Sequence, residues 1–340
     1  MLAVRVAARR FGPAVFTMTL SLAIVAQASG ASAGIRPAVS AGDLVAGAVS
    51  GELQSVAVVS VRSAWAVGGT EAGTPLILHW NGRTWRRMAG AVLSGGGTLT
   101  GVAAISTRDA WAVGAANGGA VLLERWNGRS WKRIRSPVSR GALTGVAAAS
   151  AGDAWAVGST ETGKPLTLRW NGRSWKQQPI ARPVGAVLSG VAVISRRDVW
   201  VVGSQGGGAL ALIEHWNGAA WKIVRAPRPA GGSELFSVTA VSPSNAWAVG
   251  TSDVLAGVGG AALIEHWNGK VWRQARAPRG GAGLQAVTAL SATRAWAAGG
   301  TNLEGIAASS AANAWAVGTY QDAAGPRILI EHWNGKTWTT

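Results

Sequence analysis

The sequence predicts an all-β protein, a β-propeller built from four-stranded blades. Three observations support this prediction. A Trp-rich unit recurs about every 45 residues, each unit divides into four short apolar runs, and turn residues separate the runs. Inner strands that are apolar on both faces, with a half-polar fourth strand, are typical of propeller blades. An open β-solenoid is the alternative, but its rungs are usually shorter.

Each unit contains the same elements in the same order. An opening Leu is followed by an Asp-Ala-Trp-Ala-Val-Gly element and then by a Trp-Asn-Gly-x-x-Trp element, and these account for all 19 Trp. A Ser-x-x-Asp step predicts a turn in which the Asp side chain caps its own backbone. The Asn-Gly pair predicts a hairpin between the third and fourth strands, because both residues tolerate positive φ. The opening residues are Leu53, Leu99, Leu143, Leu188, Leu235, Leu284 and Leu303.

The sixth unit is incomplete. Its opening Leu284 is followed after only 19 residues by Leu303, so the unit has two strands and lacks the Trp-Asn-Gly hairpin. The seventh unit ends just past its third Trp, which predicts a short last strand. The chain therefore holds six full repeats plus one half repeat. Both a six-bladed and a seven-bladed ring fit this count.

The N-terminal segment, residues 1–33, has the parts of a secretory signal peptide. A start with Arg5, Arg9 and Arg10 precedes an apolar run and small residues. We expect cleavage after Ala33 and a secreted, extracellular protein. An uncleaved anchor is the alternative, for which the apolar run is short.

Two further regions follow the signal peptide. Residues 34–52 are rich in Ala, Gly and Ser and are expected to form a linker, and residues 53–340 form the repeat domain. No later segment is apolar enough to span a membrane, so no membrane contact is expected beyond the signal segment.

The repeat resembles the Trp-Asn-Gly repeat propellers of secreted bacterial proteins. It is more distantly similar to the Asp-box repeats of bacterial neuraminidases and to the photosystem II stability factor propellers, which share a Trp-Ala-Val-Gly-like strand and an Asp-x-Gly-x-Thr-Trp turn. Residues 83–85 and 336–338 keep the end of that turn, but Trp80 and Trp333 stand where the Asp would be. The resemblance covers residues 53–340 and implies a bacterial propeller. It implies no particular activity, because propellers host many functions.

Basic residues are in excess, with 32 Lys and Arg against 15 Asp and Glu and a net charge of +17. Such a charge favours anionic partners. The basic residues concentrate after the third Trp of each unit, which predicts a positive outer rim. Solubility and protection of the edge strands is the other interpretation. The candidate polyanion-binding residues are Arg86, Arg87, Lys132, Arg133, Arg135, Lys222, Arg225, Arg273 and Arg276.

The residues that could catalyse a reaction do not form a catalytic arrangement. All four His occupy one repeat position, where two other units have Arg, and they are expected to pair with the neighbouring Glu. The only Tyr, Tyr320, is expected in a loop. The chain has no Cys, and it contains no phosphate-binding or metal-binding motif. We therefore predict no enzyme, no cofactor and no metal.

The expected function is that of a monomeric binding or scaffold module at the cell surface. Its partner would be a cell-envelope polyanion, a glycan or a protein. Sugar stacking on the Trp of the Trp-Asn-Gly element is one hypothesis, and packing of these Trp between blades is the other. No specific nucleic-acid binding is expected, because the Trp columns are structural rather than exposed among basic residues. The alternative function is a carbohydrate-active hydrolase or lyase on a propeller scaffold.

Overall fold

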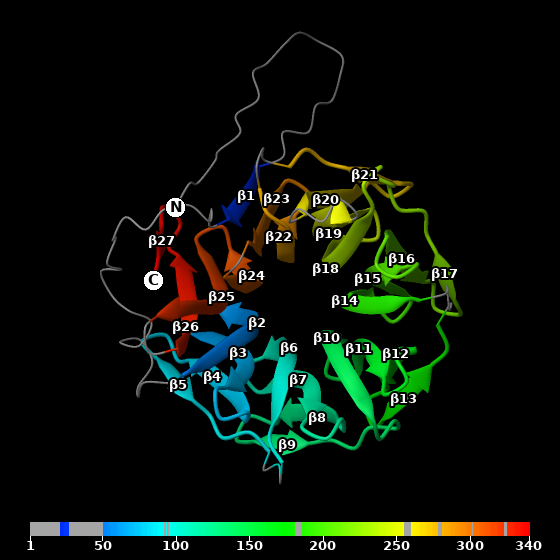
Figure 1. Cartoon of the computed structure of the whole chain (residues 1–340). Helices are drawn as coiled ribbons and strands as arrows, with labels where there is room; N and C mark the ends of the chain where they lie inside the picture. The colour runs from blue at the N-terminus through cyan, green and yellow to red at the C-terminus, as the bar shows by residue number, and fades with distance from the viewer. Residues whose placement is uncertain are drawn as a thin grey trace.

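The computed structural model describes residues 21–26, 50–91, 93, 95–180, 185–254, 260–277, 281–300, 302–322 and 325–340. These residues form seven sheets arranged as a ring around a central channel (Figure 1). Six sheets have four strands and the seventh is partial. The predicted all-β propeller is therefore confirmed. No helix in the described part of the chain is long and apolar enough to cross a membrane.

Each full repeat forms one blade, whose strands follow the chain from the channel to the outer edge (Figure 1). Blade 1 consists of β2 (Gly51–Ser60), β3 (Ser63–Thr70), β4 (Pro75–Trp80) and β5 (Trp85–Arg87). Blade 2 consists of β6 (Gly97–Ser106), β7 (Asp109–Ala116), β8 (Val121–Trp126) and β9 (Trp131–Arg133). Blade 3 consists of β10 (Gly141–Ser150), β11 (Asp153–Thr160), β12 (Pro165–Trp170) and β13 (Trp175–Gln178). Blade 4 consists of β14 (Val187–Ser195), β15 (Asp198–Gln205), β16 (Leu210–Trp216) and β17 (Trp221–Ile223). Blade 5 consists of β18 (Ser233–Ser242), β19 (Asn245–Ser252), β20 (Ala261–Trp267) and β21 (Trp272–Gln274). Blade 7 consists of β24 (Leu303–Ser310), β25 (Asn313–Asp322), β26 (Gly325–Trp333) and β27 (Trp338–Thr339).

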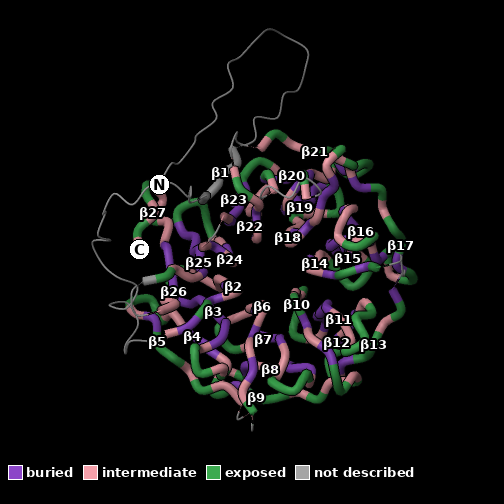
Figure 2. The backbone as a smooth tube through the Cα atoms, viewed as in Figure 1, coloured by how far each residue is buried: buried purple, intermediate pink, exposed green. Residues whose placement is uncertain are grey.

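Burial follows the order of the strands within a blade. The second strand is covered by sheets on both sides, and β7 accordingly contains five consecutive buried residues. In a fourth strand such as β9, only the Trp is buried and the next two residues are exposed. Figure 2 shows the same gradient, with buried residues inside the blades and exposed residues along the outline.

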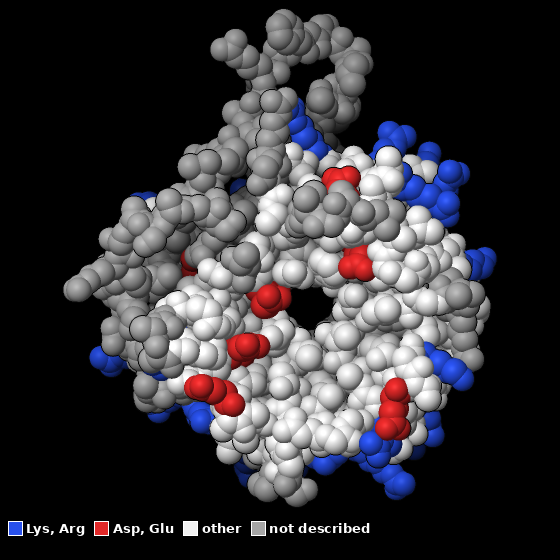
Figure 3. All heavy atoms as spheres, viewed as in Figure 1, with Lys and Arg blue, Asp and Glu red and all other residues white. Residues whose placement is uncertain are grey.

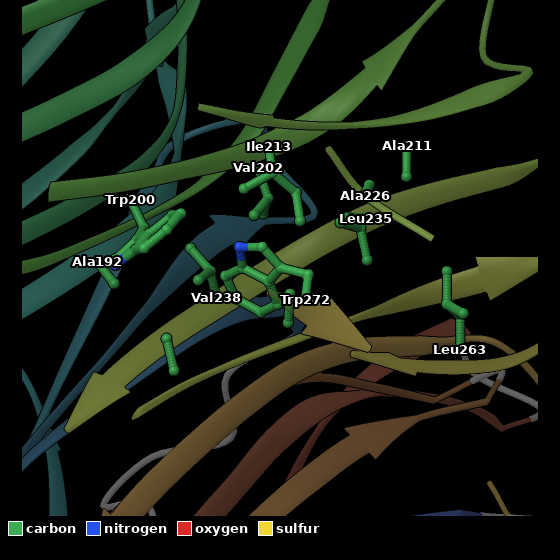
Figure 4. Packing of buried hydrophobic residues seen from close by; sticks show 12 residues of the cluster. Ala192, Trp200, Val202, Ala211, Ile213, Ala226, Leu235, Val238, Leu263 and Trp272 are labelled. Atoms are coloured by element: carbon green, nitrogen blue, oxygen red, sulfur yellow. The ribbon is translucent and has the colours of Figure 1, made fainter. Parts of the chain in front are cut away.

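Tryptophan side chains fill the interfaces between blades. Trp111 of blade 2 lies 5.0 Å from Trp170 and 5.0 Å from Trp175 of blade 3, measured between ring centroids. Figure 4 shows the equivalent cluster of blades 4 and 5, in which Trp200 and Trp272 pack with aliphatic side chains. The indole N–H of each Trp in the second column, which precedes Asn-Gly, donates to a carbonyl of its own blade's first turn. Five of these six Trp also lie against a Trp of the preceding blade, which supports packing between blades as their role.

The ring closes through the same packing. Trp315 of blade 7 lies 5.0 Å from Trp80 and 5.2 Å from Trp85 of blade 1. Arg327 of blade 7 also donates a hydrogen bond to the hydroxyl of Ser50, at 3.1 Å. Blades 1 and 7 therefore meet without sharing a strand.

The turns differ in detail from the sequence prediction. The Asn-Gly pairs do join the third and fourth strands, but in a four-residue loop where only the Gly has positive φ. The side chain of Asn171 accepts hydrogen bonds from the N–H groups of Arg173 and Ser174 at 2.9 and 3.0 Å, which fixes the loop. In the Ser-x-x-Asp turn of blade 2, the Ser106 hydroxyl accepts a hydrogen bond from the backbone N–H of Arg108. The Asp109 side chain instead accepts a hydrogen bond from Arg125 of the third strand. The prediction of a self-capping Asp was therefore wrong.

Replacing Gly172 with Ala is expected to lower the free energy of unfolding by about 1–2 kcal/mol, the cost of a left-handed conformation for a residue with a Cβ. The φ of Gly172 is +93°, and an added Cβ would meet its nearest atom at 3.6 Å, so the cost is backbone strain and not a clash. Urea unfolding measures this effect. Gly95→Ala, in an exposed position without positive φ, is the control and should be close to neutral. Equal losses for the two variants would contradict this account.

Blade 6, which is formed by the half repeat, determines the number of blades in the ring. The half repeat forms β22 (Leu284–Ser291) and β23 (Arg294–Gly299), which stand between blades 5 and 7 as a separate sheet. The ring therefore has six four-stranded blades and one partial blade. A third strand, β1 (Ser21–Ala26), joins this sheet in parallel to β23. β1 comes from the segment expected to be a signal peptide; the expected cleavage site after Ala33 and linker residues 34–49 lie outside the described residues.

Candidate functional site: the basic turn face, the rim and the central channel

The nine predicted rim residues all lie at the outer edge of the ring. They belong to the fourth strands β5, β9, β17 and β21 or to the residues just after them, and all nine are exposed. The four ion pairs found among the described residues involve none of them. The nine residues are spread over blades 1, 2, 4 and 5 and do not converge on a pocket. Figure 3 shows Lys and Arg side chains at several places along the outline of the ring.

Strand directions divide the remaining charges between two faces. Turns after the first and third strands of every blade lie on one face, called here the turn face. The starts of the first strands and the loops after the second strands lie on the other, called here the loop face. The loop face carries six described carboxylates, and Figure 3 shows acidic side chains around the channel opening. These six residues are Glu52, Glu71, Glu161, Glu234, Asp253 and Glu304.

The turn face is basic, and the sequence analysis missed it. The two turns of one blade lie side by side, because Gly82 packs against the side chain of Arg62 and Gly128 against that of Arg108. In every blade at least one of the turns adds exposed cations, and these cations make none of the ion pairs seen in the described ranges. The signal was the Arg or Lys that follows five of the six Asn-Gly pairs. The exposed cations of this face are Arg62, Arg83, Arg108, Arg129, Arg173, Arg196, Arg197, Lys270, Arg294 and Lys336.

The His and Arg column has a structural role. Arg125 donates two hydrogen bonds of 2.8 Å to Asp109, and its guanidinium lies 5.0 Å from the ring centroid of Trp111. His215 makes the same contact with Asp198 at 2.7 Å and lies against Trp200, with ring centroids 4.2 Å apart. These side chains therefore link the second and third strands of one blade. The expectation that they pair with the neighbouring Glu was wrong, because the Glu side chain points to the opposite face of the sheet.

The four positions are His79, His215, His266 and His332, and each lies on a different blade. Burial lowers the pKa of His79, His266 and His332. No group of three His, Cys, Asp or Glu within the described ranges could hold a metal ion. The expected loop position of Tyr320 was also wrong, because Tyr320 lies in β25 and packs against the cluster of blades 6 and 7.

The Glu column is buried between blades. Glu124, Glu214, Glu265 and Glu331 are all fully buried. Glu124 accepts a hydrogen bond of 2.9 Å from the N–H of Ala91, on the segment that leaves blade 1. Burial raises the pKa of Glu265 to about 8. These carboxyls are sealed inside the interfaces, so they cannot act on an external substrate.

The central channel is a cavity of about 330 Å³ lined by the first strands of all seven blades. Every first strand has a β-bulge directly after its opening Leu, and the bulged residue lines the channel. A bulge re-aims a side chain that regular pairing would place elsewhere. The bulged residues vary although each lies between a constant Leu and a small residue, and this variation was a signal that the sequence analysis did not use. They are Gln54, Thr100, Thr144, Ser189, Phe236, Gln285 and Glu304.

The chemistry of the channel is that of hydrogen bonding. Thr100 donates to the carbonyl of Leu143 at 2.6 Å, so part of this polar ring already joins neighbouring blades. Glu304 is the only ionisable residue among the described channel-lining residues. Burial raises the pKa of Glu304, and the nearby Glu52 raises it further. The channel thus offers amides, hydroxyls and one carboxyl for a small polar ligand.

Comparison with known proteins shows similarity in fold. No protein-family model and no curated protein matches the chain. The lectin SapL1, solved with α-methyl fucoside, superposes with a TM-score of 0.54 at 10% identity, over 86% of this chain and 95% of the lectin. The gluconolactonase XC5397 of Xanthomonas campestris has a TM-score of 0.50 at 13% identity, over 83% of this chain and 86% of that chain. YCF48 of Cyanidioschyzon merolae has a TM-score of 0.47 at 16% identity, over 83% and 80%. At these identities the similarity shows the β-propeller fold alone.

Proposed function

We propose that this chain is a secreted binding module that takes polyanions on its turn face and outer rim. One observation supports this most directly: the exposed cations of the turns and fourth strands lie together, while the exposed carboxylates lie on the loop face. Segregated charge creates a field that steers and holds an anionic partner. The N-terminal signal pattern of residues 1–33 supports export, and it makes an anionic cell-envelope polymer the expected partner.

The repeat suits a polymeric partner. One or two cations at the same turn positions in successive blades present charge at intervals around the ring, so a long anion would contact several blades at once. Each contact between a basic residue and a dense anionic surface contributes about 1 kcal/mol. Binding would then depend on the number of blades engaged rather than on any one side chain.

The test is binding of the purified protein to teichoic acid and to dextran sulfate at about 50 and about 500 mM salt, concentrations at which screening differs strongly. The variant Arg62→Gln, Arg83→Gln, Arg108→Gln and Arg129→Gln removes about 4 kcal/mol of such contacts and should weaken binding at low salt by roughly 1,000-fold. The control is Arg140→Gln with Lys164→Gln, which removes two cations of the loop-face loops and should change little. Binding that is insensitive to salt, or equally weakened by both variants, would contradict a polyanion site on the turn face.

A second candidate function belongs to the channel. The ring of bulged residues, with Glu304 beside Glu52, favours a small polar ligand such as a glycan end, and it is where a carbohydrate-active hydrolase would place its acid. A hydrolase needs a second carboxyl across the bond, and the described lining has one carboxyl only. Glu304→Gln separates the outcomes: a hydrolase would lose turnover with glycan binding retained, whereas a binding site would show weaker binding and no turnover in either protein.

A further inference from the structure

Blade 6 has an outer edge that its own repeat leaves open. The half repeat supplies β22 and β23, whereas every full repeat supplies four strands. In the other blades the second strand pairs with a third strand of the same repeat, and in blade 6 no such strand follows β23 in the sequence. An open edge presents N–H and C=O groups that pair with any extended chain reaching them.

The structure shows which kind of chain fits this edge. β1 pairs in parallel with the whole of β23, from Ser21 opposite Arg294 to Ala26 opposite Gly299 (Figure 1). The third strands of the full blades run antiparallel to the second, so β1 does not imitate the missing repeat strand. Its sequence, Ser-Leu-Ala-Ile-Val-Ala, is uncharged and apolar. Backbone pairing thus suffices to seat a short apolar strand that lies outside the repeat.

The interface of blades 5 and 6 lacks the contacts between Trp side chains that fill the other interfaces. Trp247 of blade 5 faces blade 6, which has no second-column or third-column Trp to receive it. Its ring contact is with His266 of its own blade at 3.9 Å, a contact that the other blades with this His also make. Trp338 of blade 7 is only partly buried, although the Trp of that column is buried in each of the five other full blades. Apolar side chains therefore border the open edge on both sides.

We propose that the outer edge of β23 is a strand-addition site. Once residues 1–33 are removed, this edge binds a short, extended, uncharged apolar segment of a partner protein, in the place and direction that β1 takes here. Main-chain hydrogen bonds supply the affinity in this kind of recognition, and side-chain pockets supply the selectivity. The site lies within blade 6 and is separate from polyanion binding on the turn face, so either proposal stands without the other. It does rest on the expected removal of the N-terminal segment.

The experiment starts from the folded full chain. A site for a specific protease is placed after Ala33, and the chain is cut after folding. A fluorescent peptide with the sequence of residues 20–27 is then titrated into cut and uncut protein. The uncut chain holds its own strand at a high effective concentration, so the peptide should bind the cut chain at least about tenfold more tightly. A peptide with Ile24→Pro and Ala26→Pro, which removes two N–H donors, is the matched control and should not bind.

Cross-linking tests the direction, without background because the chain has no Cys. Arg294→Cys is exposed and lies opposite Ser21. Adjacent strands are about 4.8 Å apart, within the Cα separation that a disulfide spans. A peptide with Ser21→Cys should form a disulfide with the Arg294→Cys chain, and one with Ala26→Cys should not.

The results that would overturn the proposal are distinct. Peptide binding that is unchanged by cutting would place it away from β23. Cross-linking of both peptides, or of the Ala26→Cys peptide alone, would contradict parallel pairing. A cut chain that dimerises and ignores the peptide would assign the edge to a second copy. A cut chain that stays monomeric and binds no peptide would restrict the edge to the chain's own strand.

Discussion

Replacing Trp111 with Ala is expected to lower the free energy of unfolding by about 4 kcal/mol, the usual cost of removing a large buried aromatic side chain. Trp111 is fully buried and lies 5.0 Å from both Trp170 and Trp175 across the interface of blades 2 and 3. Its removal leaves a cavity at a point where two sheets depend on one side chain. Urea-induced unfolding followed by Trp fluorescence measures the loss.

Trp247→Ala is the matched control from the same repeat column. Trp247 is also buried, at 2% exposure, but the half blade offers it no Trp across the interface. Each aromatic pair adds about 0.5–1.5 kcal/mol beyond burial, so Trp247→Ala should cost about 1–3 kcal/mol less than Trp111→Ala. Equal losses would mean that area burial alone, and not the contacts between Trp rings of adjacent blades, holds the ring.

Much of this architecture could be predicted from the repeat. Runs of apolar residues between turn residues determine four strands, and the recurrence of the unit determines the blades, because both depend on local patterning. The position of the two strands of the half repeat in the ring could not be predicted in this way. Whether two strands merge with a neighbour or stand as a sheet of their own depends on how seven units close a ring. That β1 pairs with β23 depends on an edge that no local pattern describes.

The candidate sites divide in the same way. The nine rim residues were predictable, because they follow a buried Trp on an edge strand. Pairing of Arg125 with Asp109, rather than with the neighbouring Glu124, was not predictable by counting along one strand. It depends on register, which places Asp109 two positions from the residue opposite Arg125, and so on the same face, and turns Glu124 to the other side. The channel residues escaped notice because a bulge breaks the alternation from which side-chain direction is inferred.

Glu265→Gln is expected to stabilise the protein, and the gain should grow as pH rises. Glu265 is fully buried, and burial raises its pKa from 4.5 to about 8. Between those values the folded chain keeps a proton that the unfolded chain releases. Unfolding therefore becomes easier as pH rises through this window. The lost stability amounts to about 4 kcal/mol by about pH 8, since each pKa unit corresponds to about 1.4 kcal/mol.

The measurement is the free energy of unfolding of both proteins at several pH values from about 5 to about 9, a range that spans the titration. Wild type and Glu265→Gln should agree near the acidic end and diverge towards the basic end. The control is Glu124→Gln, at the same position of blade 2. Burial raises the pKa of Glu124 as well, but the N–H of Ala91 and the charge of Arg133 oppose this rise, so its variant should diverge from wild type less. Curves for Glu265→Gln that run parallel to wild type would show that the carboxylate is solvated or paired.

Two residues account for the difference between the two Glu. Arg133 lies opposite Glu124, whereas the uncharged Gln274 lies opposite Glu265. Ala91 lies six positions after the third Trp of its unit, and the same position in the fourth unit is Pro227, which has no N–H to donate. Leu263, on the same face of β20 as Glu265, packs in one cluster with Ala226, the residue before this Pro. Pro227→Ala should therefore supply the missing donor, lower the pKa of Glu265 and flatten the pH dependence that Glu265 imposes. An unchanged pH dependence in Pro227→Ala would mean that the two units hold their Glu side chains differently.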